Sequence, residues 1–236
     1  MGEINTCGLL INGRPLEVYG GAALLDYSVG ETALTADTFQ GINRTSWHLL
    51  KAMFARRVIK LTIIFTGPGL HSVKLQRSML NGVLFGRSEI YISEDGFYYD
   101  VVCTSLGAEE LVGIGDTEAQ IKAEYTFEGI RRGRLKTETV AAGGSFICES
   151  TMPFTDCRLT VTVGTTASSY ALGNATFGAV TAGDILVFDG INGAITQNGT
   201  NAAATTSWVS FPALTPGINT NDALDAVTVE YYPTYI

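Results

Sequence analysis

Residues 119–128 read AQIKAEYTFE, and apolar and polar side chains alternate along this stretch. The apolar members of the alternation are Ile121, Ala123, Tyr125 and Phe127. Successive side chains of a β-strand point to opposite faces, so a period of two places these four on one face and the Lys, Glu and Thr side chains between them on the other. The stretch therefore predicts a long strand with one buried and one exposed face.

Turn signals divide the sequence before this strand into further strands. Asn12-Gly13 lies between two apolar runs, and this dipeptide favours the positive φ angles of a tight hairpin turn. Glu94-Asp95-Gly96 predicts a second hairpin, between strands near 89–92 and 97–105. Residues 60–65, KLTIIF, predict another strand that ends at a Gly-Pro-Gly turn.

Two helices are also predicted in the first half. The first is capped by Thr45 or Ser46 and shows apolar residues at spacings of three and four, with Arg56 and Arg57 in its last turn. Its apolar face comprises Trp47, Leu50, Phe54 and Val58. The second is capped by Ser72 and stopped by Gly86. Its inner face comprises Val73, Gln76, Leu80 and Leu84.

The second half consists of short strand patterns separated by turns, without a helical pattern. The strand candidates are residues 159–163, 184–188, 194–196, 208–211 and 227–232. Frequent turns between short strands are typical of a β-sandwich or jelly roll, here of about 95 residues.

The charged residues divide the chain at the same place. The net charge is −8, from 15 Lys and Arg against 23 Asp and Glu. Residues 1–140 hold 14 of the basic residues, and Arg158 is the only one in residues 141–236. We therefore expect a mainly β protein, with an N-terminal β-sandwich or barrel-like domain carrying one or two helices at 1–140 and a jelly-roll β-sandwich at 141–236. A nucleic-acid-binding protein is excluded, because phosphate contacts need clustered Lys and Arg.

The sequence predicts no catalytic, cofactor-binding or metal-binding residues. It has no phosphate-binding loop, dinucleotide fingerprint or nucleophile elbow, and its two histidines both lie in the first half. Asp184, Asp189 and Asn192 could supply calcium ligands. Aspartate or asparagine beside glycine is nevertheless typical of turns, and we expect hairpin turns there.

Three groups of residues allow more than one interpretation. Tyr231, Tyr232 and Tyr235 could stack on a glycan, although the alternation around them favours strand packing. Residues 131–134, RRGR, form the one basic run and favour a solvated loop or a subunit contact over nucleic acid. Cys148 and Cys157 could face each other across a hairpin, whereas reduced thiols fit a protein made in a cytosol.

The N-terminus carries no secretory signal pattern, and no apolar run approaches the roughly 20 residues of a membrane-spanning helix. We expect a protein that is made in the cytoplasm and does not insert into a membrane.

The order of these segments resembles that of a known family, the distal tail proteins of long-tailed, non-contractile phages. In the first half the resemblance rests on Asn12-Gly13, 27–30 (YSVG), 57–67 (RVIKLTIIFTG) and 93–99 (SEDGFYY). In the second half it rests on 183–190 (GDILVFDG), 211–219 (FPALTPGIN) and 227–233 (VTVEYYP).

This resemblance implies an N-terminal domain related to tail tube proteins and a C-terminal galectin-like or carbohydrate-module-like jelly roll. It implies a hexameric ring, without enzymatic activity or cofactor, that joins the tail tube to the tail tip or baseplate and surrounds the DNA channel. The implied partners are the tail tube, tape-measure and tail-tip or receptor-binding proteins. The implied location is the virion tail tip, after assembly in the cytoplasm of the host bacterium. The alternative function is that of a lectin-like protein that binds host surface glycans.

Overall fold

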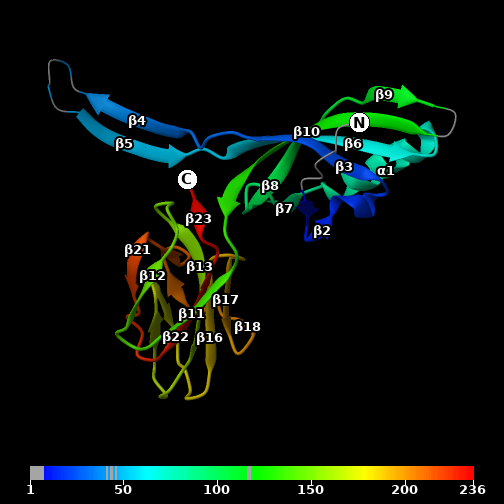
Figure 1. Ribbon diagram of the computed structural model, residues 1–236. Coiled ribbons are helices and arrows are strands. Elements are labelled where there is room, and N and C mark those ends of the chain that lie inside the picture. The colour runs from blue at the N-terminus through cyan, green and yellow to red at the C-terminus, as the bar shows by residue number, and fades with distance from the viewer. Residues whose placement is uncertain (1–7, 41, 43–44, 46, 116–117) are drawn as a thin grey trace. The chain divides into compact units, whose positions relative to one another are not determined.

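The computed structural model describes residues 8–40, 42, 45, 47–115 and 118–236 (Figure 1). The chain is mainly β and forms several antiparallel sheets, and the described residues contain one α-helix. It divides into an N-terminal unit, Met1–Arg131 with Ile236, and a C-terminal unit, Arg132–Tyr235. The division precedes the boundary expected near residue 141, because the strand Lys136–Val140 pairs with Val227–Tyr231 in the C-terminal unit. The described residues contain no helix long and apolar enough to cross a membrane.

The elements of the N-terminal unit follow one another with short connections. They are β1 (Leu9–Ile11), β2 (Arg14–Pro15), the 3-10 helix η1 (Leu16–Tyr19), β3 (Ala22–Val29), β4 (Leu34–Gln40), β5 (Trp47–Phe54), β6 (Arg57–Gly67), α1 (Leu70–Val83), β7 (Arg87–Ile92), β8 (Phe97–Leu106), β9 (Glu110–Ile114) and β10 (Ala119–Arg132). The main sheet has the order β2-β1-β7-β8-β10-β6-β3, and β9 pairs with β10 outside this path.

The strand predicted from residues 119–128 lies inside this sheet, between β8 and β6. It is β10, and its residues 119–129 pair antiparallel with β6 along their whole length. The four apolar side chains of the alternation are at most 2% exposed, which confirms the prediction of one buried face. The turn at Asn12-Gly13 is confirmed too, because both residues have positive φ, 51° and 73°.

The second predicted helix is α1, which places Val73 and Leu80 in the core. It begins two residues before the predicted cap. Gly69, with φ 103°, is at the N-cap position and makes no side-chain capping bond, so Ser72 lies inside the first turn. The prediction of a Ser72 cap was therefore wrong. The helix ends at Val83, and Gly86 follows it with φ 101°.

The first predicted helix is wrong, because residues 47–54 form the strand β5, which pairs with β4. Val58 and Arg57, assigned to the end of that helix, lie in β6. An apolar spacing of three and four can also arise by chance on a strand. Here the backbone N–H and C=O groups of residues 47–54 are paired across the β4–β5 ladder instead of within a helix. Thr45 is described and precedes the strand, while Ser46 lies outside the described residues.

The C-terminal unit is built of short strands, as predicted. They are β11 (Lys136–Val140), β12 (Ser145–Cys148), β13 (Thr155–Thr162), β14 (Tyr170–Leu172), β15 (Ala175–Phe177), β16 (Ile185–Asp189), β17 (Ala194–Gln197), β18 (Thr200–Asn201), β19 (Ser207–Trp208), β20 (Ala213–Leu214), β21 (Gly217–Thr220), β22 (Val227–Tyr231) and β23 (Thr234–Tyr235). The largest sheet has the order β11-β22-β13-β16-β17-β18, and β12-β21 and β14-β15-β19 form smaller sheets. The unit has its own core, in which Phe188, Leu186 and Tyr231 are at most 1% exposed.

Candidate functional site

β4 and β5 form a two-stranded arm in the N-terminal unit (Figure 1). It continues the ribbon formed by β3 and β6. The Gly30 N–H donates to the Val58 carbonyl at 2.8 Å, and the Ala55 N–H donates to the Ala33 carbonyl at 2.7 Å. These two bonds lie at the base of the arm. Farther along, β4 and β5 pair only with each other among the described strands. The arm is therefore a β-ribbon of two strands, with no further described strand paired to either edge.

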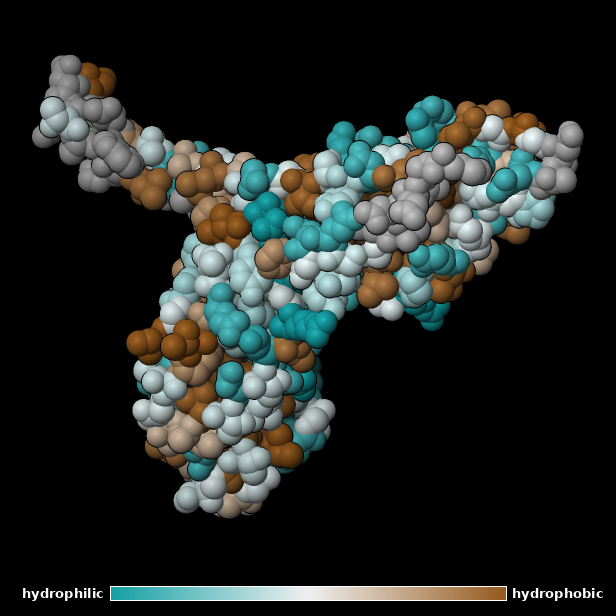
Figure 2. Space-filling model, in the orientation of Figure 1, coloured by the Kyte–Doolittle hydropathy of each residue, from teal (hydrophilic) through white to brown (hydrophobic). Residues whose placement is uncertain are grey.

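The arm exposes large apolar side chains. Leu34, Phe39, Leu49 and Met53 are between 49% and 60% exposed. Figure 2 shows hydrophobic surface along the arm. An isolated two-stranded ribbon is marginally stable in water, and clustered exposed apolar groups mark interaction surfaces. The arm thus has the composition of an element that is covered by another protein.

A buried arginine anchors the base of the arm. The Arg57 side chain is 4% exposed, and its Nη1 donates to the Gly30 carbonyl at 2.9 Å. The same Nη1 lies 3.6 Å from a carboxylate oxygen of Glu31, whose side chain is 95% exposed. The exposed partner contributes little because water screens the pair. The hydrogen bond to the Gly30 carbonyl therefore holds the guanidinium just after the end of β3, where the arm begins.

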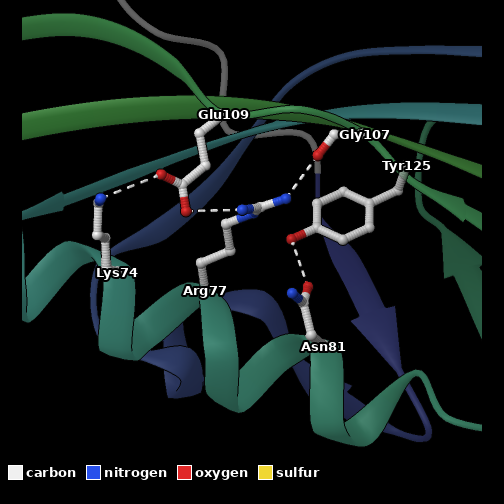
Figure 3. Close-up of polar contacts among 6 residues, drawn as sticks. All are labelled: Lys74, Arg77, Asn81, Gly107, Glu109 and Tyr125. Carbon is white, nitrogen blue, oxygen red and sulfur yellow. Dashed lines mark hydrogen bonds and ion pairs between the residues drawn. The ribbon is translucent and has the colours of Figure 1, made fainter.

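A polar cluster joins α1 to the connection between β8 and β9 (Figure 3). Arg77 on α1 donates through Nη1 to Glu109 at 2.7 Å and through Nη2 to the Gly107 carbonyl. Lys74, one turn earlier, lies 3.6 Å from the other Glu109 oxygen. These contacts fasten the connection onto the helix and so position β9, which follows it.

Tyr125 closes the same cluster from β10. Its hydroxyl donates to Asn81 Oδ1 at 3.0 Å. Burial raises the pKa of Tyr125 to about 12, against the opposing effect of the nearby Arg77 guanidinium. The phenol is thus held neutral, as a structural hydrogen-bond donor.

The edge strand β9 provides a second exposed apolar surface. It pairs with residues 119–122 of β10, and its other edge pairs with no described strand. Leu111, Val112 and Ile114 are 54%, 49% and 63% exposed. An unpaired edge with apolar side chains is a template for pairing with another chain.

One cavity of the C-terminal unit has polar side chains that already make hydrogen bonds within the protein. Its volume is about 410 Å³, and Phe146, Leu159 and Asn219 are among the residues that line it. The Asn219 amide donates to the Thr215 carbonyl at 2.8 Å, and the Asn221 amide donates to the Val140 carbonyl at 3.0 Å. Because these side-chain amides already bond to loop carbonyls, few polar groups of the cavity remain available to a ligand.

A further cavity of this unit, of about 380 Å³, has an aromatic wall. Trp208 and Phe211 form this wall, and Thr196, Asn201 and two glycines lie around it. Trp208 is 39% exposed, and its ring centroid is 4.8 Å from that of Phe211.

Solved structures share the fold of the whole chain. The crystal structure of SPP1 Dit, described as a paradigm of the hub adsorption apparatus in phages that infect Gram-positive bacteria, superposes with a TM-score of 0.71 at 12% identity, over 97% of this chain and 99% of that one. The chain has a Dit-like fold. A chain of the phage p2 baseplate, in its activated conformation with Sr, superposes with a TM-score of 0.50 at 9% identity, over 90% of each chain. No protein-family model and no curated protein sequence matches the chain.

The basic run of this Dit-like chain is not a free loop. Arg131 lies on β10, with its guanidinium 4.6 Å from the ring centroid of Phe97 and 4.0 Å from the Asp95 carboxylate. The Arg132 guanidinium lies 3.9 Å from the ring centroid of Tyr232. A solvated loop is thus the wrong interpretation for these two residues, because cation–π contacts and partial burial hold them.

The C-terminal tyrosines do not form an open stacking platform. Tyr231 is 1% exposed, and the buried positions of β22 alternate as predicted. Tyr232 is half-buried and is faced by Arg132. The aromatic wall of this unit is formed instead by Trp208 and Phe211, which were predicted to share the strand 208–211, whereas β19 ends at Trp208.

The other candidate residues have structural roles. Asp189 Oδ1 accepts hydrogen bonds from the backbone N–H groups of Ile191 and Asn192 at 2.9 and 3.0 Å, which confirms the predicted turn. The described residues contain no group of three or more His, Cys, Asp or Glu that could hold a metal ion. Cys148 and Cys157 are buried free thiols, so the hairpin disulfide is not formed.

Proposed function

We propose that this chain is a structural hub protein of a phage tail, without enzymatic activity, which assembles into a hexameric ring between the tail tube and the tail tip. The observation that carries the proposal is the arm, an exposed apolar ribbon on a chain with a Dit-like fold over nearly its whole length. SPP1 Dit belongs to a hub adsorption apparatus, and the p2 chain belongs to a baseplate.

A ring requires two different surfaces on each subunit, because one surface must meet a different one on the next copy. The N-terminal unit offers such surfaces in the arm and the β9 edge. We therefore assign ring formation to this unit, as the tail-tube-like domain. The C-terminal unit is assigned as a galectin-like jelly roll outside the ring.

The charge distribution fits a ring that surrounds DNA without binding it. The chain is acidic, and the cations Lys60, Lys74 and Lys122 are each within 3.6 Å of a carboxylate. Phosphate affinity grows with the number of neutralising contacts, so a channel lined by this protein would let DNA pass. The neighbours in the tail would be the tube protein, the tape-measure protein and the tip or receptor-binding proteins.

Native mass spectrometry and negative-stain imaging of the purified chain test the proposal. We expect hexamers and sixfold rings. The double variant Phe39→Ser, Leu49→Ser removes apolar surface from the arm and should shift the population to monomers. Both side chains are exposed, so the fold should remain. Val209→Ser is the matched control, because Val209 is 92% exposed in the C-terminal unit. A wild-type chain that remains a monodisperse monomer at micromolar concentration would contradict the proposal.

A further inference from the structure

The cavity beside β17 and β19 has an aromatic wall that is anchored to the core of the C-terminal unit. The Phe211 ring centroid is 4.8 Å from that of Trp208 and 5.8 Å from that of Phe188, which is fully buried. Trp208 itself remains 39% exposed. The Trp208 indole is thus held in place by its contact with Phe211, and the exposed part of the ring is available to a ligand.

Two glycines keep the space beside this wall open. Gly193 and Gly199 both line the cavity, and both have positive φ, 68° and 75°. A Cβ atom at Gly193 would lie 3.8 Å from the Phe211 ring. The turns on either side of β17 therefore bring backbone, and no side chain, to the rim of the aromatic wall.

The polar groups of the cavity are few and neutral. Asn201 uses its Oδ1 to accept the Ala203 N–H at 2.9 Å, and no described residue accepts from its side-chain NH₂. Thr196 also lines the cavity, and its hydroxyl has no hydrogen-bond partner among the described residues. One amide donor and one hydroxyl beside an apolar wall can orient a ligand that carries hydroxyl groups.

The charges exclude a phosphorylated or nucleotide ligand. None of the described residues that line the cavity is charged. Arg158 is the only cationic side chain after Lys136, and it lies 3.8 Å from Asp189 and 3.6 Å from Glu230. Stacking of a nucleic-acid base normally comes with a basic groove for the backbone, and the described residues that line this cavity supply no cation.

We propose that this cavity binds one ring of a neutral saccharide, stacked against Trp208 and hydrogen-bonded by Asn201 and Thr196. A pyranose ring presents C–H groups on one face and hydroxyls around its rim. The C–H face gains from burial against an aromatic face, whose quadrupole is negative. The rim hydroxyls match the neutral amide and hydroxyl. This binding is separate from ring formation, which we assign to the N-terminal unit.

Saturation-transfer difference NMR of the full-length protein tests this proposal. The probes are glucose, galactose, N-acetylglucosamine, N-acetylgalactosamine and their β1-4-linked disaccharides. We expect at least one of them to bind in the millimolar range, with saturation strongest on the C–H protons of one ring face. Failure of every probe to bind at tens of millimolar would overturn the proposal.

Two substitutions distinguish stacking from general surface contact. Trp208→Leu keeps an apolar contact with Phe211 and should abolish binding. Asn201→Asp keeps the acceptor for the Ala203 N–H, loses the amide donor, and should weaken binding about tenfold. Val209→Ala, next to Trp208 but outside the cavity, should bind as the wild type does. Circular dichroism checks that each variant folds, and Asn201→Asp carries the test if Trp208→Leu does not fold. Wild-type affinity in a folded Trp208→Leu or Asn201→Asp variant would overturn the proposal. Native mass spectrometry of the same samples reports the hexamer separately.

Discussion

Arg57 and Gly30, 27 positions apart in the sequence, are joined where the arm leaves the main sheet. The Arg57 guanidinium donates to the Gly30 carbonyl at 2.9 Å, and the Gly30 N–H donates to the carbonyl of Val58, the next residue after Arg57. Gly30 also packs closely here, because a Cβ on it would lie 3.1 Å from that Val58 oxygen. The base of the arm is thus fixed by a backbone ladder and one buried side chain.

Arg57→Met should loosen the base of the arm. The substitution keeps an apolar stem and removes the donor to the Gly30 carbonyl, a loss of about 1–3 kcal/mol. We expect faster hydrogen exchange at the backbone amides of β4 and β5, with little change in β10. Arg14→Met, on the exposed strand β2, is the control and should leave exchange in the arm unchanged. Equal protection of the arm in both variants would contradict this role of Arg57.

Gly107→Ala should destabilise the N-terminal unit. A Cβ at Gly107 would lie 2.1 Å from the Glu124 carbonyl oxygen, which also accepts the Gly107 N–H at 2.7 Å. The backbone must therefore move, at a cost of about 2 kcal/mol or more. Gly113→Ala in β9 is the matched control, because no atom lies within 4 Å of its added Cβ. Thermal unfolding monitored by circular dichroism should show a lower midpoint for Gly107→Ala only.

The sequence predicted strands best where one face is buried. In β10 the alternation agreed with burial at every apolar position from Ile121 to Phe127. In β5 the prediction failed, and the described side chains Leu49, Lys51 and Met53 are exposed, so they show no buried face that would impose a period of two. The pairing of β5 with β4 continues the pairing of β6 with β3. Because these strands are separated in the sequence, the local spacing of apolar residues in 47–58 does not reveal the pairing.

The candidate site was harder to predict than the fold. Trp208 follows Ser207 in a strand of two residues, and its neighbour in space, Phe211, lies beyond an irregular connection. The cavity also needs Gly193 and Asn201, which come from other elements. The sequence indicated Tyr231, Tyr232 and Tyr235 as stacking candidates instead, because they lie close together in the chain. The one available signal was the presence of glycines and asparagines in turns on both sides of β17.

Cys148 and Cys157 should be unreactive in the native protein. Both side chains are at most 2% exposed, and burial raises the pKa of the Cys157 thiol to about 12. The thiolate is the reactive form, so labelling needs unfolding. In a Cys7→Ser, Cys103→Ser variant we expect no reaction with Ellman's reagent at pH 8 and two thiols after addition of guanidinium chloride. A mass lower by two hydrogens, with no thiols released, would show instead that these cysteines pair.

Stability should fall as pH rises from about 10 to about 12. Burial raises the pKa of Tyr125 from 10.0 to about 12, so the unfolded chain releases the phenolic proton first. A raised folded pKa gives stability that is complete below the unfolded pKa and is lost as pH rises through the folded one. Urea unfolding at several pH values should show this decline. It should be shallower in Tyr125→Phe, and identical pH dependence in the two proteins would contradict the assignment.

Leu111→Lys tests whether the edge of β9 is a subunit contact. Leu111 is 54% exposed, so a lysine there remains solvated in the monomer and the unfolding midpoint should stay close to that of the wild type. A lysine on an edge strand opposes pairing with another strand, because burying its charge against an apolar partner is costly. Native mass spectrometry should therefore show fewer hexamers, with the change reversed in Leu111→Val, which keeps an apolar side chain. If Leu111→Lys assembles as fully as Leu111→Val, the second surface of the ring lies elsewhere on the N-terminal unit, and the arm must meet a partner other than β9.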